Sequence, residues 1–344
     1  MARKKKVSMQ DIADRLQISK NAVSLALLNK KGVSEEMRSR IVQTAREMGY
    51  GPFADKTPAS GNILVLVPER IMSYQDNDHF QFYHDMIWGL EKSIRARGLN
   101  AVVVPIGREM ELRLELPRHC SEIAYLGIVL FGIVDEAYAR VVWELDVPLV
   151  MLDSYHRGLP CPVVASANIE GADEAVSMLI RLGHRDIGFI GPANLTTSHE
   201  ERWYGYWRAM QAHGIGIRDD YILTSSRSFD YTEQEIGVFL DGMKRKPSAF
   251  FCGNDRIAYL LARQLGKRDI RVPDDISVVG FDGLRYEDEN GLQMTTMRVE
   301  KAKMADAATS LLLSVAGEGG LREAIRVHVA PTLVTGNSVR ERPE

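Results

Sequence analysis

The chain has 344 residues, of which 45% are hydrophobic and 26% charged, and its formal net charge is −3. That length is too great for one ordinary core, so we expect a small terminal domain followed by a body of two lobes. No apolar run approaches the roughly 18 residues of a membrane span, and no apolar segment follows the basic start, which argues against a membrane or exported protein and favours the cytoplasm.

The charge is unevenly distributed along the chain. Residues 1–60 carry 12 Lys and Arg against 6 Asp and Glu, a net charge of +6, whereas the remainder carries 31 against 40, a net charge of −9. A basic domain attracts phosphate groups without regard to base sequence, and an acidic body is repelled by them. The distribution therefore favours DNA as a partner of the terminal domain.

Three short helices are predicted in the first fifty residues, over Ser8–Leu16, Ser19–Asn29 and Ser34–Met48. Each begins with a serine that can accept a hydrogen bond from a free backbone N–H, and Asp11 follows Ser8 at the spacing of a capping box. Apolar residues recur at helical spacing and can close one small core: Ile12, Ala13, Leu16, Ile18, Val23, Ala26, Leu27, Ile41, Val42, Ala45 and Met48. Such a domain leaves no interior space for catalysis.

The second of these helices follows a tight turn, Leu16-Gln17-Ile18, in the arrangement of a helix-turn-helix. Its polar first residues, Ser19, Lys20, Asn21 and Ser24, are then in reach of a DNA major groove. A plain three-helix bundle has the same periodicity, so the pattern alone leaves that alternative open.

A linker rich in Gly and Pro spans residues 51–61, and the body after it alternates apolar strands with amphipathic helices. The expected strands are Ile63–Val67, Ala101–Pro105, Gly127–Phe131, Leu149–Asp153, Ile187–Ile190, the region of Tyr221–Ser225, Ala249–Phe251 and Ile276–Gly280. The expected helices are Phe82–Arg97, Glu136–Leu145, Gly171–Leu182, His199–His213, Thr232–Met243 and Asp255–Leu265. Near-continuous Val, Ile and Leu strands indicate parallel sheets covered on both faces. The repeated rhythm predicts two doubly wound α/β lobes, with a ligand cleft beyond the carboxyl ends of the strands.

Cysteine and histidine usage argues against disulfide and metal sites. Cys120, Cys161 and Cys252 lie far apart, and the 8 histidines form no cluster with ligand spacing. No phosphate-binding loop, nucleophile elbow, zinc-protease helix or dinucleotide fingerprint is present. We therefore expect no metal, no cofactor and no enzymatic activity. Two alternatives are an enzyme or sensor that acts on a small polar metabolite in the cleft, and a solute-binding protein for transport.

The chain resembles the lactose/galactose repressor (LacI/GalR) family of bacterial transcription regulators over nearly its whole length. The segments that carry the resemblance are Val7–Ala13, Ile18–Ser24, Gly32–Ser34, Gly49–Pro52, Leu182–Ile190, Asn254–Ala258 and Val272–Asp282. The last of these, Val-Pro-Asp-Asp-Ile-Ser-Val-Val-Gly-Phe-Asp, is the most specific. The resemblance implies a helix-turn-helix head on a bilobed body of the type I periplasmic-binding-protein kind.

The resemblance also implies the partners. It predicts a homodimer on a pseudo-palindromic operator in double-stranded DNA, acting on the nucleoid and controlled by a small effector. DNA contacts are expected from Ser8, Ser19, Lys20, Asn21, Ser24, Leu25 and Asn29. Lys20 and Asn21 match base-reading positions, and Leu25 stands where an arginine is common, with a thymine methyl as its available contact.

The effector site is expected in the cleft between the lobes. Arg202 occupies the position of the family's effector-binding arginine, and Asp153, Asn254 and Asp282 match positions that reach into the cleft. An arginine with carboxylate and amide partners suits the hydroxyls of a sugar or an acidic group. Four aromatic residues near these positions could stack on a sugar face or serve in the core: Phe82, which we rank first, Tyr83, Tyr155 and Trp203. For Asn254 and Asp282, turn formation and capping are the alternative roles.

The chain departs from the family at its hinge. The segment after Pro52 is short, has Phe53 where Asn is usual, and contains Pro58 and Gly61, which disfavour a helix. Gln293-Met294-Thr295-Thr296 also replaces a Pro-Leu-Thr-Thr turn. Operator spacing and effector identity therefore stay open.

The expected domain boundaries follow from these assignments. The head takes residues 1–50, the linker 51–61 and the body 62–340. The first lobe is expected to take residues 62–165 and 297–325, and the second 166–296 and 326–340.

Overall fold

The computed structural model describes residues 7–27, 32–48, 50, 61–72, 80–286, 291–317 and 324–342. The head holds three helices, α1 (Met9–Leu16), α2 (Lys20–Leu27) and α3 (Glu35–Met48). The expected capping serines are all in place. Backbone N–H groups donate to the Oγ atoms of Ser8, Ser19 and Ser34 at 3.3, 3.1 and 3.3 Å, respectively. At Ser8 the box is complete, because its own N–H donates to the Asp11 carboxylate at 2.7 Å.

The turn between α1 and α2 is the helix-turn-helix turn that the sequence predicts. Gln17 adopts φ 54°, in the left-handed region, and its neighbour Ile18 donates its N–H to the Ala13 carbonyl at 3.0 Å. The head core consists of buried residues from all three helices: Ile12, Ala13, Val23, Ala26, Ile41 and Ala45. The turn thus sets the angle between α1 and α2, and packing of the shared core against α3 stabilises that angle.

The first lobe is built on a parallel six-stranded sheet with the order β11-β5-β4-β3-β1-β2. Its strands are β1 (Asn62–Pro68), β2 (Asn100–Ile106), β3 (Gly127–Phe131), β4 (Leu149–Leu152), β5 (Val163–Ser166) and β11 (Arg326–Val329). Its helices are α4 (Phe80–Ala96), α5 (Arg108–Arg113), α6 (His119–Glu122), α7 (Glu136–Trp143) and α12 (Lys301–Gly317). Ile63 and Val65 pack toward α4 and α12, whereas Leu64 and Leu66 pack toward α7. Both faces of β1 are buried, which explains its unbroken apolar sequence.

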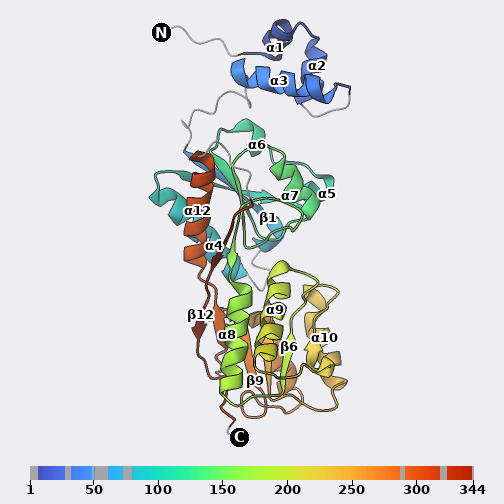
Figure 1. Ribbon diagram of the computed structural model, residues 1–344, viewed down its shortest axis with the longest axis vertical. Coiled ribbons are helices and arrows are strands. Elements are labelled where there is room, and N and C mark those ends of the chain that lie inside the picture. Colours follow the sequence, from blue (N-terminus) through green and yellow to red (C-terminus); the bar gives the residue numbers. More distant parts are fainter. Residues whose placement is uncertain are drawn as a thin grey trace.

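The second lobe repeats this plan with the order β12-β10-β9-β8-β6-β7. Its strands are β6 (Ile187–Ile190), β7 (Ile222–Leu223), β8 (Ala249–Cys252), β9 (Ser277–Asp282), β10 (Thr295–Arg298) and β12 (Thr332–Val334), the last antiparallel to β10. Its helices are α8 (Asn168–Arg181), α9 (Thr197–Ala212), α10 (Thr232–Asp241) and α11 (Asp255–Gly266). Phe189 and Phe251 face α8 and α9, and Phe250 and Val278 face α10 and α11. Figure 1 shows the two lobes one beyond the other along the long axis of the molecule.

The chain crosses between the lobes three times, from β5 to α8, from β10 to α12 and from β11 to β12. The expected boundary at residue 326, where the chain should pass back to the second lobe, is wrong. The strand β11, which begins at Arg326, still belongs to the first lobe, because it pairs in parallel with β5 of the first sheet. The expected crossing at residue 297 likewise falls inside β10. Within the described ranges, no helix is long and apolar enough to span a bilayer.

Candidate functional site

The exposed end of α2 carries the residues that the sequence assigns to DNA. Ser19, Lys20 and Asn21 are exposed, whereas Val23 and Ala26 of the same helix are buried against α1 and α3. The polar start of the helix is therefore free to enter a groove while its apolar side holds it on the head. Ser8 is exposed too, with its Oγ engaged in the capping box of α1.

The end of α2 is held by α3. Arg38 donates to the carbonyls of Leu25 and Ala26 at 3.4 and 3.2 Å. Ser24 and Leu25 are half-buried, and a Cβ built on Gly32 would lie 3.2 Å from a Leu25 methyl. The Leu25 side chain thus lies close to Gly32 as well as beside the exposed residues. Asn29 and Phe53, and with them the linker at 51–60, lie outside the described residues.

The body places four of its six predicted effector residues at the carboxyl ends of strands or in α9. Asp153 follows β4, Asn254 follows β8, Asp282 ends β9, and Arg202 lies in the second turn of α9. The carboxyl ends of parallel strands are where α/β folds bind ligands. The arrangement joins a wall of the first lobe to a wall of the second.

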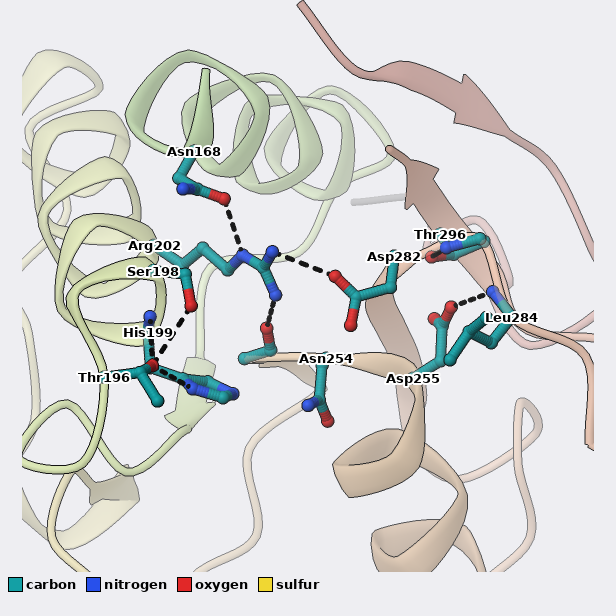
Figure 2. Close-up of polar contacts among 12 residues, drawn as sticks. Asn168, Thr196, Ser198, His199, Arg202, Asn254, Asp255, Asp282, Leu284 and Thr296 are labelled. Atoms are coloured by element: carbon teal, nitrogen blue, oxygen red, sulfur yellow. Dashed lines mark hydrogen bonds and ion pairs between the residues drawn. The ribbon is translucent and has the colours of Figure 1, made fainter. Parts of the chain in front are cut away.

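Arg202 is the centre of this arrangement (Figure 2). Its Nη2 lies 2.9 Å from the Asp282 Oδ1, its Nη1 donates to the Gly253 carbonyl at 2.7 Å, and its Nε donates to the Asn168 Oδ1 at 3.0 Å. The guanidinium carbon stands 3.8 Å from the centre of the Phe281 ring, a cation–π distance. Arg202 and Asp282 are both buried. Of the five N–H donors of a guanidinium, three are engaged in this way, which leaves two for a ligand.

The Asp153 carboxylate differs from that of Asp282 in that no hydrogen bond or ion pair reaches it from another described residue. Burial, followed by the nearby Asp282 carboxylate, raises the pKa of Asp153 to about 7. The neighbouring Tyr83 hydroxyl also has a raised pKa, first because it is buried and then because Asp153 and Asp282 lie near it. This carboxyl is therefore available to a ligand hydroxyl.

The aromatic residues divide between core and cleft. Phe82 is only 6% exposed, belongs to the core that α4 forms with the sheet, and has the Lys301 ammonium 5.3 Å from its ring centre. Trp203 stacks on Tyr206 at 5.3 Å, and the Tyr155 hydroxyl donates to Glu201 at 2.7 Å. Tyr83 is half-buried beside the acidic residues. Of the four, Tyr83 is the residue whose pKa is raised by burial and then by both Asp153 and Asp282.

Asn254 takes the capping role that the sequence left as an alternative. Its Oδ1 accepts from the Ile257 N–H at 2.9 Å and so begins α11. The next residue, Asp255, is fully buried and accepts from the Leu284 N–H at 2.6 Å (Figure 2). Burial and then the Asp282 carboxylate raise the pKa of Asp255. Asp255 thus fixes the loop that follows Asp282.

Three polar residues of this network, Asn168, Glu201 and Asp255, were not singled out from the sequence. Asp255 stands beside Asn254 in a segment that carries the family resemblance, so it could have been found. Asn168 and Glu201 meet only because α8 and α9 pack together, and no local pattern signals that contact. A separate hollow of about 450 Å³ is lined by residues such as Tyr259, Leu284 and Tyr286, and none of the six predicted residues lines it.

The described ranges contain no group of three His, Cys, Asp or Glu side chains arranged to hold a metal ion. Cys120, Cys161 and Cys252 are free thiols, as the sequence predicts, and the last two are buried. Burial raises the pKa of the Cys161 thiol to about 12. It is an inert core residue.

Two family models match the chain. Residues 8–52 match "Bacterial regulatory proteins, lacI family", and residues 176–339 match "Periplasmic binding protein-like domain". Among curated relatives, the probable HTH-type transcriptional repressor ExuR of Bacillus subtilis is 26% identical over 91% of this chain and 92% of that protein. The HTH-type transcriptional repressor CytR of Escherichia coli K12 is 27% identical over 89% of each.

Solved structures share the fold over almost the whole chain. A complex of the transcriptional regulator CelR with cellobiose has a TM-score of 0.67 at 22% identity, covering 97% of this chain and 100% of that one. The lac repressor dimer bound to operator and the anti-inducer ONPF has a TM-score of 0.62 at 19% identity, covering 97% and 99%. The head and the bilobed body thus occur together in proteins of known architecture.

Proposed function

This chain belongs to the LacI family of bacterial regulatory proteins, and from that premise we propose that it is a repressor whose operator affinity is set by a small effector bound between its lobes. The observation that carries the proposal is the presence in one chain of an exposed recognition end of α2 and a cleft centred on Arg202. Its place of action is the cytoplasm, on nucleoid DNA.

The head supplies the DNA contacts. Lys20 and Asn21 at the exposed start of α2 offer donors to guanine, and an asparagine can also pair with both edge groups of adenine. A head of this size covers one half-site, so the protein acts as a homodimer on a two-fold symmetric operator.

The cleft suits a sugar or sugar derivative. The free donors of Arg202 and the acceptors of Asp153 can bind vicinal hydroxyls, and the half-buried Tyr83 ring can cover an apolar sugar face. The cellobiose complex of a structural neighbour has a ligand of this class. The relatives are regulators, which supports control of transcription over catalysis in the cleft.

Control follows from a difference in effector affinity between two arrangements of the lobes. An effector that binds one arrangement better shifts the population toward it, and the shift changes how the two heads of a dimer fit their half-sites. The effector must contact both walls to do this, and Asp153 and Arg202 come from opposite walls.

The test is selection of duplexes from a random library of about 30 base pairs at near-physiological salt, where non-specific phosphate binding fades. The selection is repeated with five sugars or sugar derivatives that differ in size and charge: D-ribose, L-arabinose, cellobiose, D-galacturonate and cytidine. Enrichment of a two-fold symmetric sequence, altered by one of these compounds, is expected. Absence of any enriched sequence would contradict the proposal and favour an enzyme or sensor with a head that does not read DNA.

A further inference from the structure

Glu201 lies in α9 immediately before Arg202 and joins residues from both lobes. Its Oε1 accepts from the Tyr155 hydroxyl at 2.7 Å, and its Oε2 accepts from the Asn168 Nδ2 at 2.9 Å. Tyr155 lies between β4 and β5 of the first sheet, whereas α9 belongs to the second lobe. Asn168 begins α8, directly after the first crossover of the chain. One carboxylate thus bonds the first lobe, the crossover and the second lobe together.

The same contacts continue to the effector arginine. The Asn168 Oδ1, on the amide whose Nδ2 bonds Glu201, accepts from the Arg202 Nε at 3.0 Å. Arg202 is in turn paired with Asp282. On the other side, the Arg326 guanidinium of β11 lies 4.0 Å from the centre of the Tyr155 ring. The result is a continuous polar path from the first sheet through Glu201 to the effector site.

We infer that Glu201 is a positioning residue that couples closure of the lobes to the orientation of Arg202. Glu201 is 8% exposed, and its two carboxylate oxygens accept from neutral donors, the Tyr155 hydroxyl and the Asn168 amide, so its burial depends on both of them. When the lobes separate, Tyr155 withdraws its hydroxyl and water replaces it. Glu201 is then held by protein on one oxygen only, so its carboxylate can rotate, and the Asn168 amide that bonds it and orients the Arg202 Nε is fixed less firmly. This inference rests on the proposed effector control.

The neighbouring residue Glu200 provides a matched control. Arg157, two residues after Tyr155, pairs with Glu200 at 2.6 Å, so this contact also joins the two lobes. Its arginine side chain is 66% exposed, and an exposed ion pair contributes little. In the part of the chain that the structure describes, the Glu200 carboxylate makes no hydrogen bond or ion pair with Asn168 or Arg202, and its other bond comes from the Tyr204 hydroxyl on its own helix. Glu200→Gln therefore removes an interlobe charge without touching the polar path.

The first experiment measures amide hydrogen exchange of the full-length protein without effector or DNA. Glu201→Gln is expected to accelerate exchange at residues 154–158 and 168–172 by about 10-fold, because the amide cannot accept from both donors. Glu200→Gln should stay within about 2-fold of wild type in both segments. Equal exchange in wild type and Glu201→Gln would overturn the inference. If Glu201→Gln does not fold, Tyr155→Phe removes the same bond from the other lobe.

The second experiment measures operator affinity with and without whichever of the five compounds acts on wild type. Tyr155→Phe and Glu201→Gln should each reduce the effector-induced change in operator affinity to within about 2-fold, and the double variant should be no worse than the more damaged single variant. Full additivity of the two effects would overturn the inference. If no compound acts on wild type, effector control has failed its own test, and the exchange experiment still decides the role of Glu201.

Discussion

Two aspartates of the cleft have backbone conformations that few side chains adopt. Asp153 has φ 68° and Asp282 has φ 104°, and both follow or end a strand at its carboxyl edge. Each such conformation costs on the order of 1–3 kcal/mol and is kept only where the surroundings require it. The two positions are those at which the proposed ligand meets the two lobes. The backbone at both positions is therefore held in place by the surrounding fold at the ends of β4 and β9.

The raised pKa of Asp153 leads to a pH-dependent prediction. Below its ordinary pKa of 3.8 the carboxyl is protonated in the folded and the unfolded protein. Between 3.8 and about 7 the unfolded chain releases the proton while the folded protein keeps it, so this group lowers the free energy of unfolding as the pH rises. Asp153→Asn removes this pH dependence, since the amide does not titrate. The free energy of unfolding of the variant, relative to that of wild type, should therefore rise by at least about 1 kcal/mol between about pH 5 and pH 8, measured by urea unfolding.

The exposed carboxyl of Glu174 on α8 serves as the comparison for Asp153. Glu174→Gln should follow the wild-type pH profile. Parallel profiles for Asp153→Asn and wild type would contradict the protonation argument.

Arg202→Ala is expected to affect stability as well as effector response. The substitution leaves the Asp282 carboxylate buried without its ion-pair partner, so the free energy of unfolding should fall by about 3 kcal/mol. Arg208→Ala, on the same helix, breaks an ion pair whose arginine is 45% exposed and should cost less than about 1 kcal/mol. Denaturant titration of both variants checks the difference. Equal losses would mean that the Arg202 pair is no more important than a surface pair.

Asn21→Ala tests the DNA-reading role of α2. Loss of a base contact should cost about 1–3 kcal/mol at one symmetric position of the operator and relax the base preference there. The measurement is duplex selection with the variant, compared with wild type. Weakening that is uniform across all sequences would instead show that Asn21 contacts only phosphate.

At the scale of elements, the sequence predicted the regular parts of the fold well. Strands such as β1 and β3 are buried on both faces. Burial on both faces requires an unbroken run of apolar residues, and such a run predicts the strand from the sequence alone. The serine caps of the head join residues only three apart in the sequence, so the sequence predicts them as well. The helix bounds of α8, α9 and α11 agree with expectation to within a few residues.

The elements that were missed depend on tertiary contacts. The sequence pattern does not predict the helix α12, because its apolar and small residues are spread around its circumference where it packs on both the sheet and α4. The strand β11 was placed in the wrong lobe because its pairing with β5 joins segments far apart in the sequence. In the site, Arg202 and Asp282 were found from family motifs, but the link through Asn168 and Glu201 arises only when α8 packs on α9.

The close approach of β9 and α11 gives a prediction at this scale. A Cβ on Gly280 would lie 2.0 Å from the Asp255 Oδ1, so Gly280→Ala must displace a buried carboxylate. We expect it to lower the free energy of unfolding by about 1–3 kcal/mol. Gly266→Ala, at the end of α11 with no atom within 4 Å of its Cβ, should be neutral or stabilising by up to about 1 kcal/mol. Thermal unfolding distinguishes them, and equal stability of the two variants would contradict the packing argument.

At the scale of the whole molecule, the basic head and the acidic body have different functions. The head, at +6 over residues 1–60, supplies attraction to DNA, and the body supplies a cleft whose walls come from separate sheets. Three crossovers join these sheets, so the lobes can change their relative arrangement without unfolding either. A ligand that contacts both walls then favours one arrangement of the lobes, and that change alters the affinity of the head for DNA.

The most direct test of this account is the affinity of the full-length protein for its selected operator, titrated with and without each of the five compounds by fluorescence anisotropy. The account predicts that at least one compound changes the operator dissociation constant by about 5-fold or more, and that Asp153→Asn diminishes the change. A sequence-specific operator whose affinity responds to a compound equally in wild type and Asp153→Asn would contradict control through this cleft.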